Sequence, residues 1–539
     1  MAPFTIGDLM TVTTMRSPDA VFIQADPDGS FETASDRGGR WHAGGAVLEY
    51  SATGDARLVS ADVVSRLALR WALGVPERSR VFADAWERTY GESGWAGVHP
   101  DRALPWFWLA HDESAGTTIG AGVATGPGAW ASWTVDVDGV TLWLDVRSGQ
   151  RALQPGDREV ELATVLSLES GNTPFAAHAE LTAAMAPPSP VAVGPIVGSN
   201  NWYYAYGHGF DADAVVQDAR TIVELAGGHP VQPFAVIDAG WGEGNGSADG
   251  GPFNRGKGSL RDMSAVADRI RNEGARPGLW YRPLLTREPS PIAHDVRLDD
   301  GFPLDPSLPG TLERVGDDLV RFRDWGYELV KHDFSTFDVA GAFAPAFGAR
   351  MGSGAITFGD RTRTTAEIIR NFYRVVAGAA GDAVVIGCNT VGHLAAGLVA
   401  VNRIGDDTSG KQWERTRRMG VNTLAMRLAQ HGRFFTADAD CVPATPATPW
   451  ELNRQFLELV AASGTALFLS LDPASLSREV RRNVADAMAI ALDGGVDGGV
   501  EPFDQLYSTT PRRWRIGDEE RVFDWSDRMG AVPFVHGVE

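Results

Sequence analysis

The sequence is poor in cysteine and in long hydrophobic runs. Only Cys388 and Cys441 occur among 539 residues, which excludes a disulfide-stapled scaffold and a four-cysteine zinc site. No run of 18 apolar residues is found, so no membrane-spanning helix is expected. The first eight residues contain neither a basic region nor an apolar segment of the signal-peptide type. We therefore expect a soluble, cytoplasmic protein.

Basic residues are also scarce relative to acidic ones. Lys and Arg total 48 and Asp and Glu total 69, which gives a net charge of −21. A surface this acidic repels phosphate backbones and anionic lipids, so neither nucleic acid nor a membrane is expected as a partner. Hydrophobic residues make up 44 % of the chain, enough for a large core. At roughly 150 residues per domain, the length allows two to four domains.

Residues 1–190 have the pattern of an all-β domain. The alternating runs 133–138 and 140–146 are joined by Asp138-Gly139, a strong hairpin signal. One helix is expected near Ser60–Leu73. Large aromatic residues predict a β-sandwich core, with sugar binding by some of them as the alternative. These aromatic residues are Trp106, Phe107, Trp108, Trp130, Trp133 and Trp143.

Beyond a Pro-rich hinge at 186–190 the pattern changes to short apolar runs separated by amphipathic stretches. This alternation is typical of a parallel sheet with crossover helices. The eight predicted strands are Pro195–Trp202, Pro233–Trp241, Arg276–Arg282, Glu328–Ser335, Ala383–Asn389, Val401–Asp407, Arg433–Asp440 and Ala466–Asp472. They predict a central (β/α)8 TIM barrel over residues 191–495. Residues 496–539 are expected to form a short C-terminal β segment packed as an appendage.

Carboxylates end five of the eight predicted strands. They are Asp238, Asp333, the pair Asp406 and Asp407, the pair Asp438 and Asp440, and Asp472. Active sites of such barrels lie at the C-terminal ends of the strands, and a ring of carboxylates suits a substrate with several hydroxyl groups. Most enzymes that cleave glycosidic bonds use two opposed carboxyl groups. For any single aspartate, a role as a helix cap or turn former is an equal alternative.

Other side chains at these strand ends fit the same interpretation. The flat faces of Trp202, Trp241 and Trp280 are suited to stacking on a sugar ring. Lys331 lies two residues before Asp333 and so points the same way in a strand, where its charge would keep Asp333 ionised. The Asp438-Ala439-Asp440 segment alternatively suggests a metal site, but it lacks clustered histidines. No metal and no cofactor are therefore expected.

In order along the strands, these segments resemble the α-galactosidase clan, glycoside hydrolase families 27 and 36, over roughly residues 195–475. Lys331-His332-Asp333 resembles the family Lys-x-Asp that ends in the nucleophile, and Arg403 with Asp407 resembles the Arg-x-x-x-Asp that ends in the acid/base. Further resembling segments are Asn201-Trp202, Ile237–Trp241, Cys388, Asp438–Asp440 and Leu469–Pro473. Since many enzymes of this clan are oligomers, the resemblance also leaves a homo-oligomer open.

Three positions depart from the family pattern. Ala239 stands where the family has a second aspartate that holds the O4 and O6 hydroxyls of the sugar. Arg282 stands where family 36 has a glutamate. The segment after Cys388 begins with Asn389-Thr390 in place of Ser-Gly. Losing a buried acceptor costs binding of the hydroxyl that needs it, so the identity of the sugar stays open.

The resemblance implies a retaining exo-glycoside hydrolase of the α-galactosidase type, with Asp333 as nucleophile and Asp407 as acid/base. Asp406 is the alternative acid/base if the register shifts by one residue. The expected substrate-binding residues are Trp202, Asp238, Trp241, Trp280, Arg282, Lys331, Cys388, Asn389, Arg403 and Asp440. Alternatives are a transglycosylase of the same clan, a sugar-binding barrel that has lost catalysis, and a metal-dependent isomerase or lyase acting on sugar acids.

Overall fold

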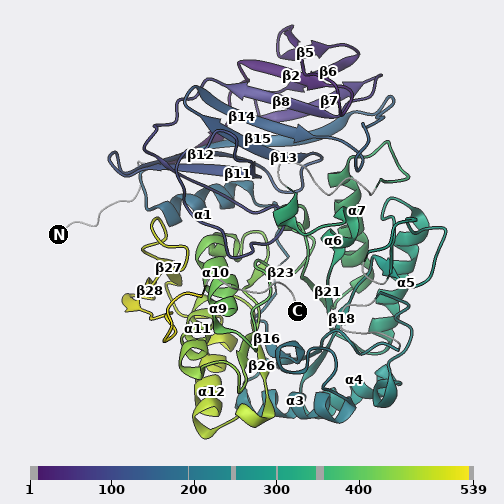
Figure 1. The fold of residues 1–539 in the computed structure, drawn as a ribbon, viewed down its shortest axis with the longest axis vertical. Coiled ribbons are helices and arrows are strands. Elements are labelled where there is room, and N and C mark those ends of the chain that lie inside the picture. The colour runs from purple at the N-terminus through teal and green to yellow at the C-terminus, as the bar shows by residue number, and fades with distance from the viewer. Residues whose placement is uncertain (1–9, 192, 244–249, 299–300, 348–356, 533–539) are drawn as a thin grey trace.

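The computed structural model describes residues 10–191, 193–243, 250–298, 301–347 and 357–532. Residues 1–8, on which the expectation about a signal peptide rests, lie outside these ranges. A β-rich part lies over a part in which helices surround a parallel sheet (Figure 1). This is the predicted combination of an N-terminal sandwich and a central barrel.

Two antiparallel sheets form the N-terminal sandwich. The first sheet runs in the order β4 (Ser35–Asp36), β5 (Arg40–Ala43), β6 (Ala46–Tyr50), β7 (Asp55–Ser60), β15 (Val160–Ser170), β12 (Thr117–Val123), β11 (Phe107–Asp112) and β9 (Arg80–Ala83), with β1 (Met10–Thr14) also paired to β15. The second runs β10 (Leu104–Pro105), β13 (Trp130–Asp136), β14 (Gly139–Asp145), β8 (Arg66–Trp71), β2 (Ala20–Gln24) and β3 (Glu32–Thr33). The predicted hairpin is confirmed, because β13 and β14 pair antiparallel across Asp136 and Gly139.

The helix expected near Ser60–Leu73 is wrong. This segment contains β8, a central strand that pairs with both β14 and β2. The side chains of Leu67, Leu69 and Trp71 are fully buried, while the intervening positions face the other side of the sheet. This period of two is the strand pattern, and pairing on both edges satisfies the backbone in the extended form.

A helix that the sequence analysis did not predict follows the last sandwich strand. Helix α1 (Pro174–Met185) starts with the Thr173 side chain accepting the N–H of Ala176 and with Pro174 in its first turn, as helix N-termini commonly do. It packs against β12 and β15. Ala177, Leu181 and Met185 are buried there. The Thr-Pro pair was the available sequence signal.

All eight predicted barrel strands are present and parallel. Around the barrel they are β16 (Val197–Asn200), β17 (Phe234–Ile237), β18 (Arg276–Tyr281), β21 (Leu329–His332), β22 (Val384–Gly387), β23 (Val401–Arg403), β24 (Thr436–Asp438) and β26 (Leu467–Leu471). A bridge between Asp438 and Ala466 joins the last two strands, and Ala466 N–H donates to the carbonyl of Ala437 at 2.9 Å. The sheet therefore closes on itself. A short strand, β25 (Val442–Ala444), lies along β26.

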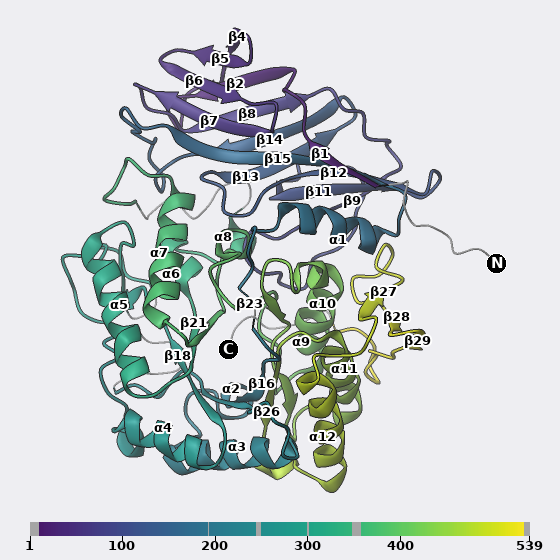
Figure 2. The ribbon, with the colours of Figure 1, turned by 180° about the vertical axis from the view of Figure 1, so that it is seen from behind.

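Helices between these strands cover the outside of the barrel (Figure 2). The longer ones are α3 (Ala212–Leu225), α4 (Met263–Asn272), α5 (Pro309–Asp324), α7 (Thr365–Ala380), α11 (Trp450–Ser463) and α12 (Arg478–Leu492). The shorter ones are α2 (Trp202–Ala205), α6 (Ser335–Ala340), α8 (Gly392–Ala395), α9 (Trp413–Thr416) and α10 (Asn422–Arg427). None of the helices in the described part of the chain is long and apolar enough to cross a membrane.

Two small sheets complete the described fold. Strands β19 (Leu285–Thr286) and β20 (Phe302–Pro303) form a hairpin-like pair within a barrel loop. Strands β27 (Val500–Pro502), β28 (Arg513–Ile516) and β29 (Glu519–Val522) form the C-terminal sheet, which lies beside the barrel helices (Figure 2). Trp413 of α9 donates its indole N–H to the carbonyl of Trp525 at 2.9 Å, so the expected C-terminal appendage is anchored to the barrel.

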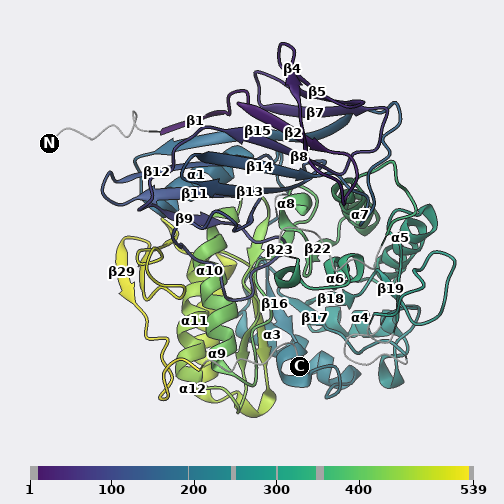
Figure 3. The ribbon, with the colours of Figure 1, turned by 45° about the horizontal axis from the view of Figure 1, so that its top comes forward.

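A loop of the sandwich enters the mouth of the barrel, above β22 and β23 (Figure 3). Within it, the N–H of Thr89 donates to the carbonyl of Ile404 at 3.1 Å, and the carbonyl of Thr89 accepts from the N–H of Asp406 at 2.8 Å. At the start of the loop, the Asp84 carboxylate lies 2.7 Å from Nε of Arg427 on α10. Both side chains of this ion pair are at most 2 % exposed. The two domains are thus joined through buried polar contacts.

Removing one partner of this ion pair should destabilise the folded state. We expect Asp84→Ala to lower the free energy of unfolding by about 3–5 kcal/mol, because it leaves the buried guanidinium of Arg427 without its carboxylate. Urea unfolding followed by circular dichroism measures the effect. The surface pair of Arg220 with Glu273 provides the control, where Glu273→Ala should cost much less because solvent screens the pair. Equal losses in the two variants would contradict the prediction.

Candidate active site

Asp333 follows directly on β21, at the C-terminal end of the barrel strands. Its N–H donates to the carbonyl of Tyr281 at 2.9 Å, which holds the backbone beside β18. One carboxylate oxygen accepts from the indole N–H of Trp280 at 3.2 Å, and the other accepts from the N–H of Phe334 at 2.7 Å. The side chain stays partly exposed. Two donors therefore orient a carboxylate that a ligand can still reach.

Lys331 and Asp238 form a buried ion pair beside it. Their Nζ and Oδ2 atoms are 2.7 Å apart, and Oδ2 also accepts from Nδ2 of Asn200 at 2.6 Å. Burial acts to lower the pKa of Lys331, but the charge of Asp238 outweighs it, and the pKa lies well above its ordinary value. The direct partner of Lys331 is thus Asp238, and Asp333 is a further negative charge that favours its protonated form.

Arg403 is the second buried cation of the site. Its Nη2 lies 2.6 Å from Oδ2 of Asp440 and 2.9 Å from Oδ1 of Asp407. The hydroxyl of Tyr203 donates to Asp440. Asp440 itself adopts φ = +75°, a left-handed conformation that is uncommon outside glycine. The structure therefore brings two predicted carboxylates, those of Asp407 and Asp440, to one predicted guanidinium.

The neighbours Asp406 and Asp407 face different surroundings. The Asp406 side chain is 5 % exposed and lies 2.8 Å from Arg88 and 2.7 Å from Arg415. The Asp407 side chain is 23 % exposed. Burial acts to raise the pKa of Asp407, but Arg403 and Arg88 outweigh it and lower that pKa. Of the two carboxylates, Asp407 is the one that a substrate can approach.

Cys388 and Asn389 follow β22, between the strands that carry the two aspartates. The Cys388 thiol is buried and free, burial raises its pKa well above the ordinary value, and its sulfur accepts from Arg403 at 3.7 Å. Asn389 is also buried, and its Nδ2 donates to Oε1 of Glu87 at 2.6 Å. Both predicted residues thus lie at the barrel mouth and contact groups of the site.

Glu87 and Arg88 reach the site from the sandwich loop, and the sequence analysis did not predict them. Glu87 is fully buried, and its Oε1 accepts from Tyr90 at 2.6 Å. Burial raises the pKa of Glu87 to about 7. Arg88 places Nη1 3.7 Å from Oδ1 of Asp407. No motif marks these residues, since only the packing of sandwich on barrel brings them to the strand ends.

Three of the residues predicted to contact a substrate lie outside the cluster around Asp333 and Asp407. Trp241 is fully buried and packs on Phe322 and Trp325 behind the strands, so the structure does not bring it to the site. Arg282 is fully buried and pairs with Asp338 at 2.7 Å. Trp202 is half-buried on α2 beside β16. Contact of Arg282 or Trp202 with a substrate stays a prediction.

The remaining strand-end aspartates also differ from one another. Asp438 is buried, burial raises its pKa to about 6, and its carboxylate accepts the N–H of Asp440 at 2.9 Å. Asp472 accepts the N–H of Ala474 at 2.9 Å and caps a short helical turn, which is the role expected of a turn former. In the described ranges, no three His, Cys, Asp or Glu side chains are grouped as metal ligands.

Several solved structures share this fold. An α-galactosidase from Thermus thermophilus, solved with p-nitrophenyl α-D-galactopyranoside, matches with a TM-score of 0.61 and 18 % identity over 90 % of this chain and 98 % of that one. The family 36 α-galactosidase AgaB from Geobacillus stearothermophilus matches with a TM-score of 0.59 and 14 % identity over 90 % and 77 %. The galactosidase domain of the α-galactosidase-sucrose kinase AgaSK gives 0.59 and 13 % over 90 % and 71 %.

The chain has the fold of family 36 α-galactosidases. This confirms the fold that the resemblance implied. No family model matches the sequence, and no curated protein matches it. At these identities the likeness establishes the fold, and the chemistry has to be argued from the side chains.

The buried carboxyl of Glu87 predicts a pH dependence of stability. Its pKa is about 7 in the folded chain and 4.5 in the unfolded chain, so the folded state binds more protons between these values. This contribution is fully present below pH 4.5 and is lost as the pH rises through 7, by about 3 kcal/mol in total. We expect Glu87→Gln to remove it, so that the stability of the variant falls less than that of the wild type between pH 5 and 8.

Denaturant unfolding at several pH values measures this difference. Glu224→Gln changes an exposed glutamate whose side chain is 66 % accessible and should follow the wild type throughout. A Glu87→Gln curve parallel to the wild type would contradict the prediction.

Proposed function

We propose that the chain is a retaining exo-glycoside hydrolase of the α-galactosidase type. The observation that carries the proposal is the pair of accessible carboxylates, Asp333 after β21 and Asp407 after β23. The first is held by neutral donors from Trp280 and Phe334, and the second by the cation of Arg403. Two carboxyl groups with different environments are what acid/base and nucleophilic roles require.

In the first step an Asp333 oxygen attacks the anomeric carbon and forms an ester bond to it. The bond from that carbon to the leaving oxygen breaks, and the leaving oxygen takes the proton of Asp407. In the second step Asp407 accepts a proton from water, the water oxygen bonds to the anomeric carbon, and the carboxylate of Asp333 is released. Two inversions leave the anomeric configuration unchanged.

Two buried ion pairs near these carboxylates are suited to recognition of the sugar. The buried pair of Lys331 with Asp238 and the pair of Arg403 with Asp440 present polar groups with fixed positions, which suits hydroxyl recognition. Ala239 is buried beside Asp238 and has no acceptor in its side chain. We therefore propose a terminal α-linked sugar whose recognition at that position differs from the family pattern.

The nucleophile assignment is tested with Asp333→Asn on a panel of nitrophenyl glycosides. The panel contains the α-galactoside, the α-N-acetylgalactosaminide, the α-glucoside and the β-L-arabinopyranoside. We expect the wild type to cleave one member and the variant to lose about 10⁴-fold or more in kcat. Asp472→Asn is the matched control at another strand end, and its activity should stay within about twofold, because Asp472 caps a turn.

Three results would change the assignment. Normal turnover by Asp333→Asn would overturn it. Sugar binding by the wild type without turnover would favour a barrel that binds and no longer cleaves. Transfer of the sugar to an added saccharide in preference to water would favour the transglycosylase.

The position of Arg88 predicts a shift of the pH–rate profile. Arg88 is one of the cations that lower the pKa of Asp407, and Asp407 must be protonated to act as an acid. Arg88→Gln removes the cation and raises this pKa, so the acid stays protonated to higher pH. We expect the basic limb of kcat/KM to move to higher pH while the acidic limb moves less.

The full profile between pH 4 and 9 on the best substrate measures this shift. Arg415→Gln, which removes the other partner of Asp406, is the comparison variant and should move the basic limb less. A basic limb that stays in place or moves to lower pH in Arg88→Gln would contradict the prediction.

A further inference from the structure

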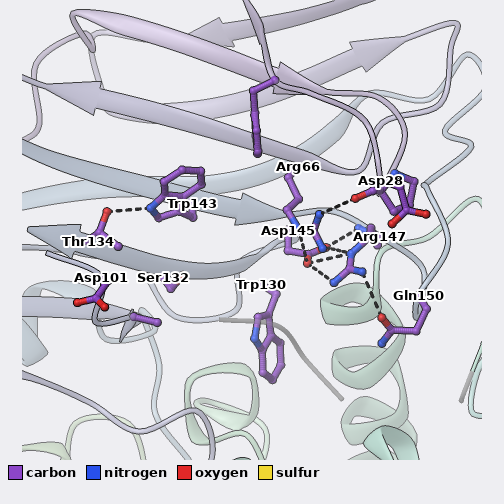
Figure 4. A pocket seen from close by; sticks show the side chains of 13 residues that line it. Asp28, Arg66, Asp101, Trp130, Ser132, Thr134, Trp143, Asp145, Arg147 and Gln150 are labelled. Atoms are coloured by element: carbon purple, nitrogen blue, oxygen red, sulfur yellow. Dashed lines mark hydrogen bonds and ion pairs between the residues drawn. The ribbon is translucent and has the colours of Figure 1, made fainter. Parts of the chain in front are cut away.

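The outer face of the second sandwich sheet carries a cavity of about 620 Å³ (Figure 4). This volume is within the range of small-molecule sites in proteins. Its floor is formed by β13, β14 and β8, and its rim by the segments before β3, before β10 and after β14. The lining includes Phe31, Arg66, Trp130, Thr134, Trp143 and Asp145.

The strand register places Trp143 on the face of the sheet that points away from the sandwich core, where polar residues are expected. Ser132 of β13 lies opposite Trp143 of β14, so both point to the same, outward face. Thr134 lies two residues further along β13 on that face. The opposite face of the sheet carries the apolar core, including Trp133, Leu142 and Leu144. The indole of Trp143 is therefore not needed to fill the sandwich.

The ring of Trp143 is held in place and remains half-buried. Its N–H donates to the hydroxyl of Thr134 at 2.9 Å, a bond visible in Figure 4. Phe31 packs edge-on against it with ring centroids 5.7 Å apart, and Phe31 is itself 36 % exposed. Two aromatic rings on a polar sheet face form the kind of patch that marks a binding site.

Charged and amide groups lie beside these rings. Asp145 is 3.3 Å from Arg66 and 2.6 Å from Arg147, and Arg147 also donates to Oε1 of Gln150 at 3.2 Å. Figure 4 shows this cluster on one side of the cavity, with Trp143 on the other. The cluster offers both donors and acceptors in fixed positions. Both guanidinium groups among the described lining residues are paired with Asp145, which disfavours a phosphate as the ligand.

The net charge of the lining supports a neutral ligand. Among the described lining residues, Asp28, Asp101 and Asp145 stand against Arg66 and Arg147, so this lining carries about one negative charge, which disfavours an anion. A saccharide has the complementary properties, since the C–H groups of a sugar ring pack on an aromatic face and its hydroxyls hydrogen-bond to side chains that offer both donors and acceptors.

We propose that this cavity is a second saccharide-binding site, separate from the barrel mouth, with Trp143 as its stacking platform. The cavity is connected to the active site by packing. Trp130 at its edge stacks on Trp86 with ring centroids 5.1 Å apart, and Trp86 directly precedes Glu87. A chain bound here would lie on the domain whose loop completes the active site.

The test uses the full chain with the Asp333→Asn substitution, so that sugars bind without turnover. Isothermal titration with raffinose, stachyose and galactomannan oligosaccharides should show two classes of site. Adding Trp143→Ala should weaken one class at least tenfold, and adding Trp143→Phe, which keeps an aromatic face, should retain it. Ala103→Arg should have the effect of Trp143→Ala by filling the cavity without removing the ring.

The controls separate this site from the barrel. Tyr507 is an exposed aromatic residue outside the cavity, and Tyr507→Ala should leave both classes unchanged. In the otherwise wild-type chain, Trp143→Ala should hydrolyse nitrophenyl glycosides within about twofold of the parent, which also shows that the variant folds. If the barrel binds no sugar, binding that depends on Trp143 still supports this proposal while the proposed function fails.

Two results would overturn the proposal. In the first, the Asp333→Asn chain binds every saccharide with the same number of sites and the same affinity whether or not it also carries Trp143→Ala. In the second, the chain binds inorganic phosphate and no saccharide, and Trp143→Ala abolishes the phosphate binding.

Discussion

The structure of the barrel mouth depends on ion pairs between buried carboxylates and buried cations. A charge removed from water is costly unless a partner and further hydrogen bonds compensate for it. Arg403 is 1 % exposed and lies between Asp407 and Asp440. Lys331 is the cation that pairs with the buried carboxylate of Asp238. These pairs determine which oxygens are engaged and which remain for a ligand.

The pairing also separates the roles of neighbouring aspartates. Asp406 is covered by two arginines, whereas Asp407 shares Arg403 with Asp440 and stays partly exposed. Asp333 is held by the neutral N–H groups of Trp280 and Phe334. Carboxylates at similar positions along the barrel thus differ in access and in charge environment, which is the condition for one to attack and another to transfer a proton.

The sandwich is a part of this arrangement and not only a neighbour of it. Its loop supplies Arg88, which lies near both Asp406 and Asp407, and Glu87, which accepts from Asn389 of the barrel. The buried pair of Asp84 with Arg427 holds the loop in place. Removing the sandwich would therefore take the Asp84 carboxylate away from buried Arg427 and the Glu87 acceptor away from Nδ2 of Asn389.

Much of the fold could be predicted from the sequence, because period-two and helical alternation are local properties. The eight barrel strands and the hairpin at Asp138-Gly139 follow from such patterns. The helix predicted near Ser60–Leu73 is a strand, and Leu67, Leu69 and Trp71 alternate accordingly. Whether such a short apolar segment forms a strand depends on the neighbours that pair with its edges, here β14 and β2.

The sequence by itself determined which residue types end each barrel strand, and so placed Asp333, Lys331, Arg403 and Asp407 at one end of the barrel. Only the tertiary structure decided their partners. In the folded chain Trp241 is buried behind the strands, and Arg282 is paired with Asp338. Glu87 and Arg88 contact Asn389 and Asp407, from which they are separated by more than 200 residues of sequence. Strand ends are set by local periodicity, whereas ion pairs between distant segments depend on how whole domains pack.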